Sequence, residues 1–160
     1  MKLRIIATGG TIDKTYSSHT SNFEVDEPQI GELLRQANVS FEFEVESLLK
    51  KDSLEFTDQD RRLIRDHVAR AAERHIVITH GTDTMIQTAK TLLDIRDKVI
   101  VLTGAIKPAQ FKESDAEFNI GVACAAAQIL QPGVYVAMNG RIFIPSRVTK
   151  NLELQRFEEM

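Results

Sequence analysis

The stretch IVITHGTDTM, residues 76–85, constrains the fold of this chain more than any other. Ile76–Ile78 is a run of β-branched residues, which is typical of a strand buried on both faces. Gly81 ends the strand, and apolar residues then recur at spacings of three and four from Met85 onward, which indicates a helix. A strand that leads into a helix in this way is typical of a parallel α/β sheet, in which ligands bind where the strands end.

The polar residues of this junction have two interpretations. In the structural one, Thr84 and Gln87 form a capping box, and Asp83 is a favourable negative charge near the helix N-terminus. The functional interpretation is supported by a second junction of the same kind, because the apolar strand that ends at Ala7 continues into Thr8-Gly9-Gly10-Thr11. Two strand ends that each present glycine with threonine favour one shared site.

Strand and helix patterns alternate along the chain. Strands are predicted at residues 2–8, 40–49, 76–78, 98–102 and 134–138, and helices at 28–36, 57–74, 85–93 and 115–131. Asn139-Gly140 predicts a type I′ hairpin that leads into a short return strand at 141–144. The alternation predicts one α/β domain, residues 1–160, with a mostly parallel sheet flanked by helices in three layers.

Several segments carry more specific expectations. The 40–49 strand alternates apolar and acidic residues, which predicts a half-exposed strand near a sheet edge. The 57–74 helix begins with a capping box from Thr57 and Asp60, and its apolar stripe includes Leu63. His67 on that stripe is interpreted as a packing residue rather than a metal ligand.

Two polar segments are predicted to lie outside the sheet. Residues 9–22 form a long polar loop, and such loops often act as lids over active sites. The charged residues after Lys150 are interpreted as a tail, with a helix and a solvated end as the two alternatives.

Length and composition narrow the class of protein. A chain of 160 residues holds one ordinary domain, and a net charge of −3 argues against nucleic acid as the main partner. No apolar run reaches the roughly 18 residues of a membrane span, and Ile5–Ala7 is too short for a signal-peptide core. The one cysteine, Cys124, reads as a small buried hydrophobe that cannot form an internal disulfide. These features predict a cytoplasmic protein without membrane association.

The residue types at the two junctions limit the chemistry. The glycine patterns of triphosphate-binding and dinucleotide-binding loops are absent, and the histidines lack the spacing of a metal site. A threonine hydroxyl at a strand end needs a neighbouring base before it attacks a carbonyl, and a partly desolvated lysine can serve as that base. Backbone N–H groups after the glycines can hold an oxyanion or a carboxylate. The residues alone therefore predict acyl transfer on a small polar substrate.

Two motifs in this chain resemble the signatures of the bacterial-type L-asparaginase family. They are ATGGTI at residues 7–12 and THGTDT at residues 79–84, at the family's separation. Weaker matches follow in the family's order at residues 52–57, 102–108 and 147–150. The resemblance covers essentially the whole chain. It implies hydrolysis of the side-chain amide of asparagine, with release of ammonia, through a covalent acyl-enzyme and without a cofactor.

The resemblance also implies roles for individual residues. Thr11 is the nucleophile, and Thr82, Asp83 and Lys150 form a hydroxyl–carboxylate–lysine group that activates a water or the threonine. Ser53 holds the substrate carboxylate, and Asp83 faces its α-amino group. The full implied sets are Thr11, Tyr16, Thr82, Asp83 and Lys150 for catalysis, and Gly10, Asp52, Ser53, Gly81 and Ala105 for substrate binding.

The chain departs from the family pattern at several points. Ordinary members continue into a second domain that supplies an acidic residue to a neighbouring subunit, whereas this chain stops ten residues after Lys150. The family's lid tyrosine falls on Phe23, so that Tyr16 is its expected replacement, and the substrate-loop glutamine appears as Leu54. These departures indicate a short, single-domain branch of the family. Its site is completed within the domain or by a partner subunit, with Glu153, Glu158 and Glu159 as candidate acids.

Three functional hypotheses remain open on the sequence. The first is an asparagine amidohydrolase that acts as a homodimer or higher homo-oligomer. The second is a sensor module that binds an amino acid without turnover, against which the retained Thr11 and Lys150 argue. The third is hydrolysis of another small amide or ester by the same threonine, which Leu54 keeps open.

Overall fold

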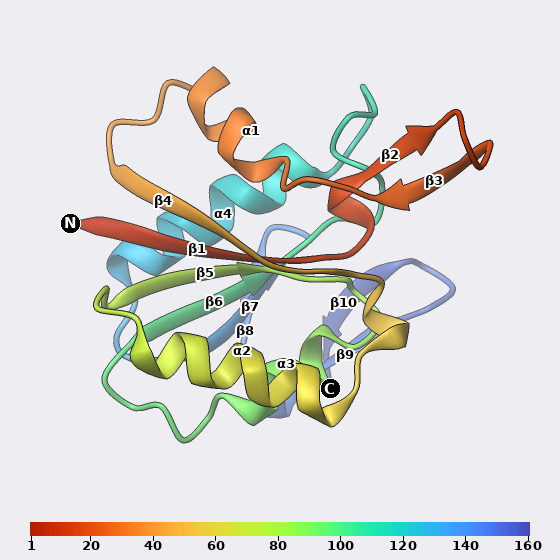
Figure 1. Ribbon diagram of the computed structural model, residues 1–160. Coiled ribbons are helices and arrows are strands. Elements are labelled where there is room, and N and C mark those ends of the chain that lie inside the picture. Colours follow the sequence, from red (N-terminus) through yellow and green to blue (C-terminus); the bar gives the residue numbers. More distant parts are fainter.

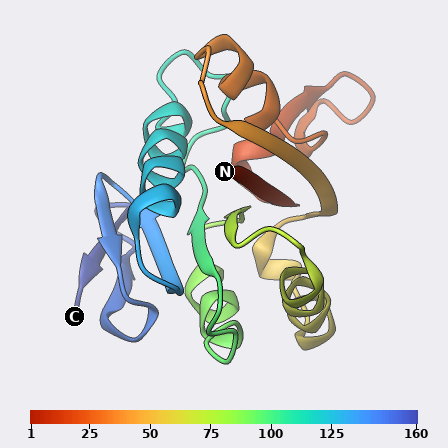
Figure 2. The same cartoon turned by 90° about the vertical axis from the view of Figure 1, so that its left-hand side faces the viewer.

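The computed structural model describes residues 1–160 and has three layers, with helices on both faces of one central sheet (Figures 1 and 2). The strand order is β4-β1-β5-β6-β7-β8, and only β8 runs antiparallel to its neighbour. The strands are β1 (Lys2–Gly9), β4 (Glu42–Lys51), β5 (His75–Thr79), β6 (Val99–Thr103), β7 (Gly133–Met138) and β8 (Arg141–Phe143). The predicted α/β class with a mostly parallel sheet is confirmed.

The central strands are apolar on both sides because each side faces a different layer of helices. Along β5, Ile76 and Ile78 belong to one core cluster and Val77 belongs to the other. The first cluster lies under α2 (Asp58–Arg70) and α3 (Met85–Thr91), and the second lies under α1 (Ile30–Gln36) and α4 (Ala116–Ile129) (Figure 1). The run of β-branched residues thus reports burial on both faces.

The edge strand and the α2 cap agree with the sequence patterns. β4 lies at the edge of the sheet, as predicted. At the start of α2, the Thr57 hydroxyl accepts from Asp60 N–H, and the Asp60 carboxylate accepts from Thr57 N–H, which confirms the capping box. The helix ends at Arg70, four residues earlier than predicted, and Leu63 is 39% exposed rather than inward. His67 is half-buried, and its Nδ1 lies 2.8 Å from Glu46 Oε1.

Two predictions about the polar segments were wrong. Residues 9–22 are not an open loop, because a 3₁₀ turn, η1 (Thr11–Asp13), leads into a hairpin of β2 (Lys14–Ser17) and β3 (Asn22–Val25). The tail is not helical either: η3 (Pro145–Arg147) leads into a second hairpin, β9 (Val148–Asn151) and β10 (Arg156–Glu159). Cross-strand hydrogen bonding between short polar strands overrides the local preference in both segments.

The two turn signals at strand ends had different outcomes. Asn139 and Gly140 have φ angles of 54° and 76°, the left-handed values that a type I′ turn requires, and they join β7 to β8 as predicted. The proposed Thr84–Gln87 capping box was wrong. The Thr84 hydroxyl instead donates to the carbonyl of Ser53, and the Gln87 side chain accepts from Arg61.

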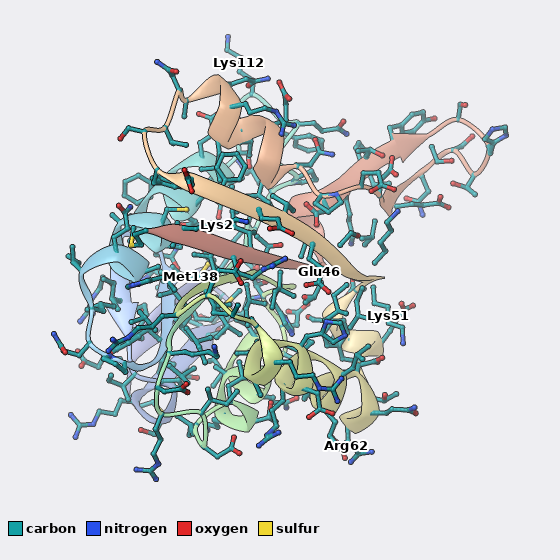
Figure 3. All side chains as sticks on the ribbon, turned by 60° about the vertical axis from the view of Figure 1, so that its left-hand side comes forward. Lys2, Glu46, Lys51, Arg62, Lys112 and Met138 are labelled. Carbon is teal, nitrogen blue, oxygen red and sulfur yellow. The ribbon has the colours of Figure 1, made fainter.

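The parallel strands β1, β4, β5 and β6 all finish at the same end of the sheet, which is the end opposite the N-terminus (Figure 1). This carboxyl end of the sheet is the edge at which the site lies. Figure 3 shows both ends of the sheet, with Lys2 at the start of β1 and Lys51 at the end of β4. The β2–β3 hairpin projects from this same edge. No helix in the structure is both long enough and apolar enough to cross a membrane.

Candidate active site

The backbones of three segments meet at this edge because small residues stand at the contacts. A Cβ atom added to Gly10 would lie 2.5 Å from Gly81 Cα, and one added to Gly81 would lie 2.6 Å from the Ser53 side chain. Side chains larger than hydrogen would therefore push these segments apart. Gly10, Gly81 and Ser53, all predicted substrate-binding residues, are brought together as one wall of the site.

Thr11 follows directly from this contact. It opens η1, is half-buried, and is preceded by Gly10 with φ 89°, a backbone conformation that favours glycine. The next residue, Ile12, is fully buried, and its carbonyl accepts from Ala109 N–H at 3.1 Å. The turn that carries Thr11 is therefore anchored both to the Gly81 segment and to the segment after β6.

Lys150 joins the second motif by direct hydrogen bonds. Its Nζ donates to Thr82 Oγ1 at 2.9 Å and to Asp83 Oδ1 at 2.8 Å, and its side chain is only 10% exposed. Thr82 is buried and Asp83 is exposed. A hydroxyl, a carboxylate and a largely desolvated ammonium group thus form one connected cluster, which is the arrangement needed to move a proton to or from the hydroxyl.

The second hairpin puts Lys150 in place. Val148 and Phe157 are buried in the core cluster under α2 and α3, and Phe157 pairs with Lys150 across the hairpin. Because side chains alternate along a strand, Lys150 lies on the same inward side of β9 as Val148. Phe157 N–H also donates to Asn139 Oδ1 at 2.8 Å, which fixes the hairpin to the β7–β8 turn. A helical tail would not place the lysine in this way.

His80 is a structural residue of the site that sequence reasoning did not assign. It is fully buried, with Nδ1 2.7 Å from the Gly81 carbonyl and Nε2 2.7 Å from the Thr88 hydroxyl. Burial lowers its pKa from 6.5 to about 4, despite the hydrogen bond to Gly81, so the ring is neutral at pH 7. Because a carbonyl only accepts, Nδ1 carries the proton and Nε2 accepts from Thr88. The ring therefore fixes the backbone at Gly81.

Asp52 forms a second charged group at the rim of the site. It begins the 3₁₀ turn η2 (Ser53–Glu55), accepts from Leu54 N–H at 3.0 Å, and lies 3.2 Å from Lys14 Nζ on β2. Burial alone would raise the pKa of Asp52, but the Leu54 N–H and the positive charges of Lys14 and Lys150 outweigh it and lower the pKa. Asp52 is therefore anionic and links the hairpin to the Ser53 turn. Lys14 was not predicted as a site residue, because a lysine within a polar segment of the sequence gives no sign of its contact with Asp52.

Ala105 and Tyr16 lie at different depths. Ala105 is 1% exposed, and its neighbour Gly104 packs so closely on the His80 carbonyl that an added Cβ would lie 2.3 Å from it. Tyr16 is 57% exposed on β2, where it is directly paired with Phe23, and the two ring centroids are 5.6 Å apart. The structure thus buries Ala105 in the core next to Gly104 and leaves Tyr16 on the hairpin, packed on Phe23.

The predicted residues therefore separate into three groups. Thr82, Asp83 and Lys150 are hydrogen-bonded to one another, while Gly10, Ser53 and Gly81 pack together beside Thr11. Asp52 and Ala105 lie in the adjoining turns, and Tyr16 is held on the hairpin. No group of three or more His, Cys, Asp or Glu side chains has the arrangement of a metal site.

The fold and this cluster define a class: three-layer α/β domains that present glycine and threonine at the carboxyl ends of parallel strands, here joined by a lysine from a separate hairpin. Residues 2–157 match the model of the asparaginase family, described as "Asparaginase, N-terminal". The chain belongs to the asparaginase family.

Individual relatives agree with this assignment. The L-asparaginase of Thermococcus kodakarensis is 34% identical over 100% of this chain and 51% of its own length. The glutaminase-asparaginase of Acinetobacter glutaminasificans is 33% identical over 94% of this chain and 50% of its own length. The chain thus spans about half the length of these curated relatives.

Solved structures of asparaginases also match this chain over about half of their own length. The thermostable L-asparaginase from Thermococcus kodakarensis superposes with a TM-score of 0.87 at 30% identity, covering 100% of this chain and 51% of the other. The probable cytoplasmic L-asparaginase from Campylobacter jejuni gives a TM-score of 0.78 at 28% identity, covering 99% and 51%.

Proposed function

We propose that this chain is an amidohydrolase that converts L-asparagine to L-aspartate and ammonia. The observation that carries the proposal is the Lys150–Thr82–Asp83 cluster, hydrogen-bonded at 2.8–2.9 Å beside the turn that begins with Thr11. A binding module would need neither a half-buried threonine hydroxyl nor a desolvated lysine next to a second hydroxyl.

The proposed reaction has two steps. The Thr11 hydroxyl loses its proton and its oxygen bonds to the side-chain amide carbon of asparagine, and the C–N bond then breaks to release ammonia. Water next adds to the aspartyl ester on Thr11, and the threonine oxygen leaves with a proton. In both steps Lys150 accepts a proton through the Thr82 hydroxyl or a water and then returns it to the leaving group, which is the amide nitrogen in the first step and the Thr11 oxygen in the second. Asp83 stabilises the ammonium group that is present between the two transfers.

Substrate binding is proposed to use the packed wall of the site. The buried Ser53 hydroxyl accepts from Thr84 N–H at 3.3 Å, which leaves its own proton to donate to an α-carboxylate. Asp83 is 39% exposed and retains oxygen atoms that can accept from an α-ammonium group while it holds Lys150. Tyr16 is proposed to replace the family's lid tyrosine, because it lies directly across the hairpin from Phe23.

A different small amide or ester is a second candidate substrate. Leu54 occupies the position of the family's substrate-contacting glutamine and is 72% exposed at the rim of the site. An apolar side chain there removes a polar contact and favours a substrate with an apolar substituent.

A homodimer or higher homo-oligomer in the cytoplasm is part of the same proposal. The outward face of the Ala-rich helix α4 exposes Phe118 and Ile129, at 62% and 76%, and a subunit interface on this face would cover both side chains. The cytoplasmic setting is supported by the description of the Campylobacter jejuni relative and by the single thiol, Cys124, which is buried. Light scattering at micromolar concentration distinguishes a dimer from an 18.0 kDa monomer.

Ammonia release from a panel of amides tests the activity. The panel contains L-asparagine, D-asparagine, L-glutamine and an asparagine ester or anilide. The proposal predicts the highest kcat/KM with L-asparagine. A higher value with a substrate that carries an apolar group would favour the second candidate, and binding of aspartate without turnover of any substrate would favour a sensor module.

A further inference from the structure

Asp13 is a buried acid two residues after Thr11 that the proposed reaction does not use. It is 1% exposed and closes the 3₁₀ turn η1. A carboxyl group that is taken out of water needs compensating partners, so an acid at this position calls for a specific explanation.

Each polar group of Asp13 fastens a different segment to the turn. Its N–H donates to the Gly10 carbonyl at 3.2 Å, which closes the turn itself. Its carbonyl accepts from Asp26 N–H at 2.9 Å, which ties the turn to the end of the β2–β3 hairpin. Its carboxyl oxygen accepts from Gln29 N–H at 3.0 Å, at the residue that precedes α1. The turn that carries Thr11 is therefore attached to α1 by the Asp13 side chain.

The surroundings of the carboxyl favour its neutral form. Burial raises the pKa of Asp13 from 3.8 to about 7, although the Gln29 N–H works in the opposite direction, and the negative charge of Glu27 raises it further. Lys50 reaches Glu27 from β4, and Asp26 is held by the Thr15 hydroxyl and Glu27 N–H.

We propose that Asp13 is a positioning residue for Thr11: its buried carboxyl, bound to Gln29 N–H, holds the turn in the reactive geometry. Ionisation strengthens the single bond to Gln29 N–H, but the cost of burying the charge is larger, so the ionised carboxyl favours opening of the turn to water. This inference rests on the proposed function. It predicts an effect on kcat with little effect on KM, because Ser53 and Asp83, which are proposed to bind the substrate, lie on other segments.

The test compares Asp13→Asn with the wild-type chain across pH. Asparagine keeps the acceptor for Gln29 N–H and cannot ionise. We expect the ratio of kcat in Asp13→Asn to kcat in the wild type to be near one at about pH 5.5 and to rise about fivefold or more by about pH 8.5. KM should stay within about twofold. Taking the ratio cancels ionisations that both proteins share.

Two control variants test whether the pH dependence of kcat comes specifically from the Asp13 carboxyl. Asp26→Asn removes the neighbouring exposed carboxyl, and its ratio to the wild type should not change with pH. Glu27→Gln removes the like charge, and the loss of kcat at high pH should begin at a lower pH in that variant, since a lone Lys50 then favours the ionised Asp13. A ratio for Asp13→Asn that is independent of pH would overturn the proposal.

A readout without turnover separates failure of this inference from failure of the proposed function. Amide hydrogen exchange at Gln29, corrected for its intrinsic pH dependence, should lose protection in the wild type between about pH 5.5 and pH 8.5 and keep it in Asp13→Asn. If the wild type does not hydrolyse any amide but shows this difference, the proposed function fails and the attachment stands. Equal protection in both proteins would overturn the role of Asp13 whether or not the chain is active.

Discussion

Lys150 Nζ lies 2.9 Å from the Thr82 hydroxyl, although the two residues are 68 positions apart, with Lys150 on β9 and Thr82 in the bend between β5 and α3. The contact depends on the β9–β10 hairpin, which holds the lysine against the end of β5. We expect Lys150→Met to lower kcat by roughly 10²–10⁴-fold, the usual effect of removing a group that transfers protons, because Met keeps the length and loses the amine. Lys90→Met on the exposed side of α3 is the matched control and should be neutral. Full turnover with weakened aspartate binding would show that Lys150 serves only to position charge.

Thr11→Val tests the nucleophile with little change in shape. Valine is nearly isosteric with threonine, so the turn should keep its fold while the attacking oxygen is lost. We expect kcat to fall by several orders of magnitude and the melting temperature to change little. The control is Thr15→Val, whose hydroxyl bonds Asp26 outside the site. Residual activity above about a tenth of the wild type, a barrier change below roughly 1.4 kcal/mol, would remove Thr11 from this role.

Replacing glycine by alanine should lower the free energy of unfolding at Gly10 and raise it at Gly121. Gly10→Ala adds a Cβ 2.5 Å from Gly81 Cα at a φ of 89°, and should cost roughly 2–4 kcal/mol of unfolding free energy. Gly121→Ala on α4 places a methyl in open space and should stabilise the domain by up to about 1 kcal/mol. Urea unfolding of both variants measures the difference. A neutral Gly10→Ala would mean that the contact between the two motifs is not close-packed.

Asp13 and His80 should have opposing effects on stability in the same pH range. The pKa of Asp13 is raised from 3.8 to about 7, so its stabilising effect is complete below 3.8 and is lost as pH rises to about 7. The pKa of His80 is lowered from 6.5 to about 4, so its stabilising effect is complete above 6.5 and is lost as pH falls to about 4. Between about pH 4 and pH 6.5 the two effects, each on the order of 3–4 kcal/mol, largely cancel.

Asp13→Asn should expose the effect of His80. The wild type should show a nearly constant urea midpoint between about pH 4 and pH 6.5, whereas the variant should become progressively less stable as pH is lowered through that interval. Parallel curves for the two proteins would show that Asp13 does not titrate in this range.

The parts of the fold that sequence patterns predicted are those with a strong local signal. The runs of β-branched residues in β5 and β6, the Thr57–Asp60 cap and the Asn139-Gly140 turn each have one physical interpretation, and each is present in the structure. The two hairpins that were missed turn through Ser21 and Gln155, with φ angles of 55° and 49°. Left-handed conformations at these residue types carry no glycine signal, so neither turn is readable from the sequence.

The candidate site was predicted unevenly for a similar reason. Glycine with threonine at two strand ends pointed to one shared site, because the ends of parallel strands meet at one edge. Lys150 was found only through the family resemblance, since its approach to Thr82 depends on a hairpin that the sequence does not signal. Asp13 and His80 were not assigned because their roles come from burial and from hydrogen bonds to backbone groups distant in sequence.

Trapping of an aspartyl ester on Thr11 tests whether this threonine is the nucleophile. The 160-residue chain is mixed with L-asparagine, quenched in acid within milliseconds, digested and examined by mass spectrometry. We expect the peptide containing Thr11 to gain the mass of one aspartyl group, and Thr11→Val to show no such gain. If hydrolysis of the ester is slower than its formation, ammonia should also appear in a burst of one equivalent per site in the wild type and not in Thr11→Val. Ammonia release at the wild-type rate by Thr11→Val, or an aspartyl adduct on another residue, would contradict the role of Thr11 as the nucleophile.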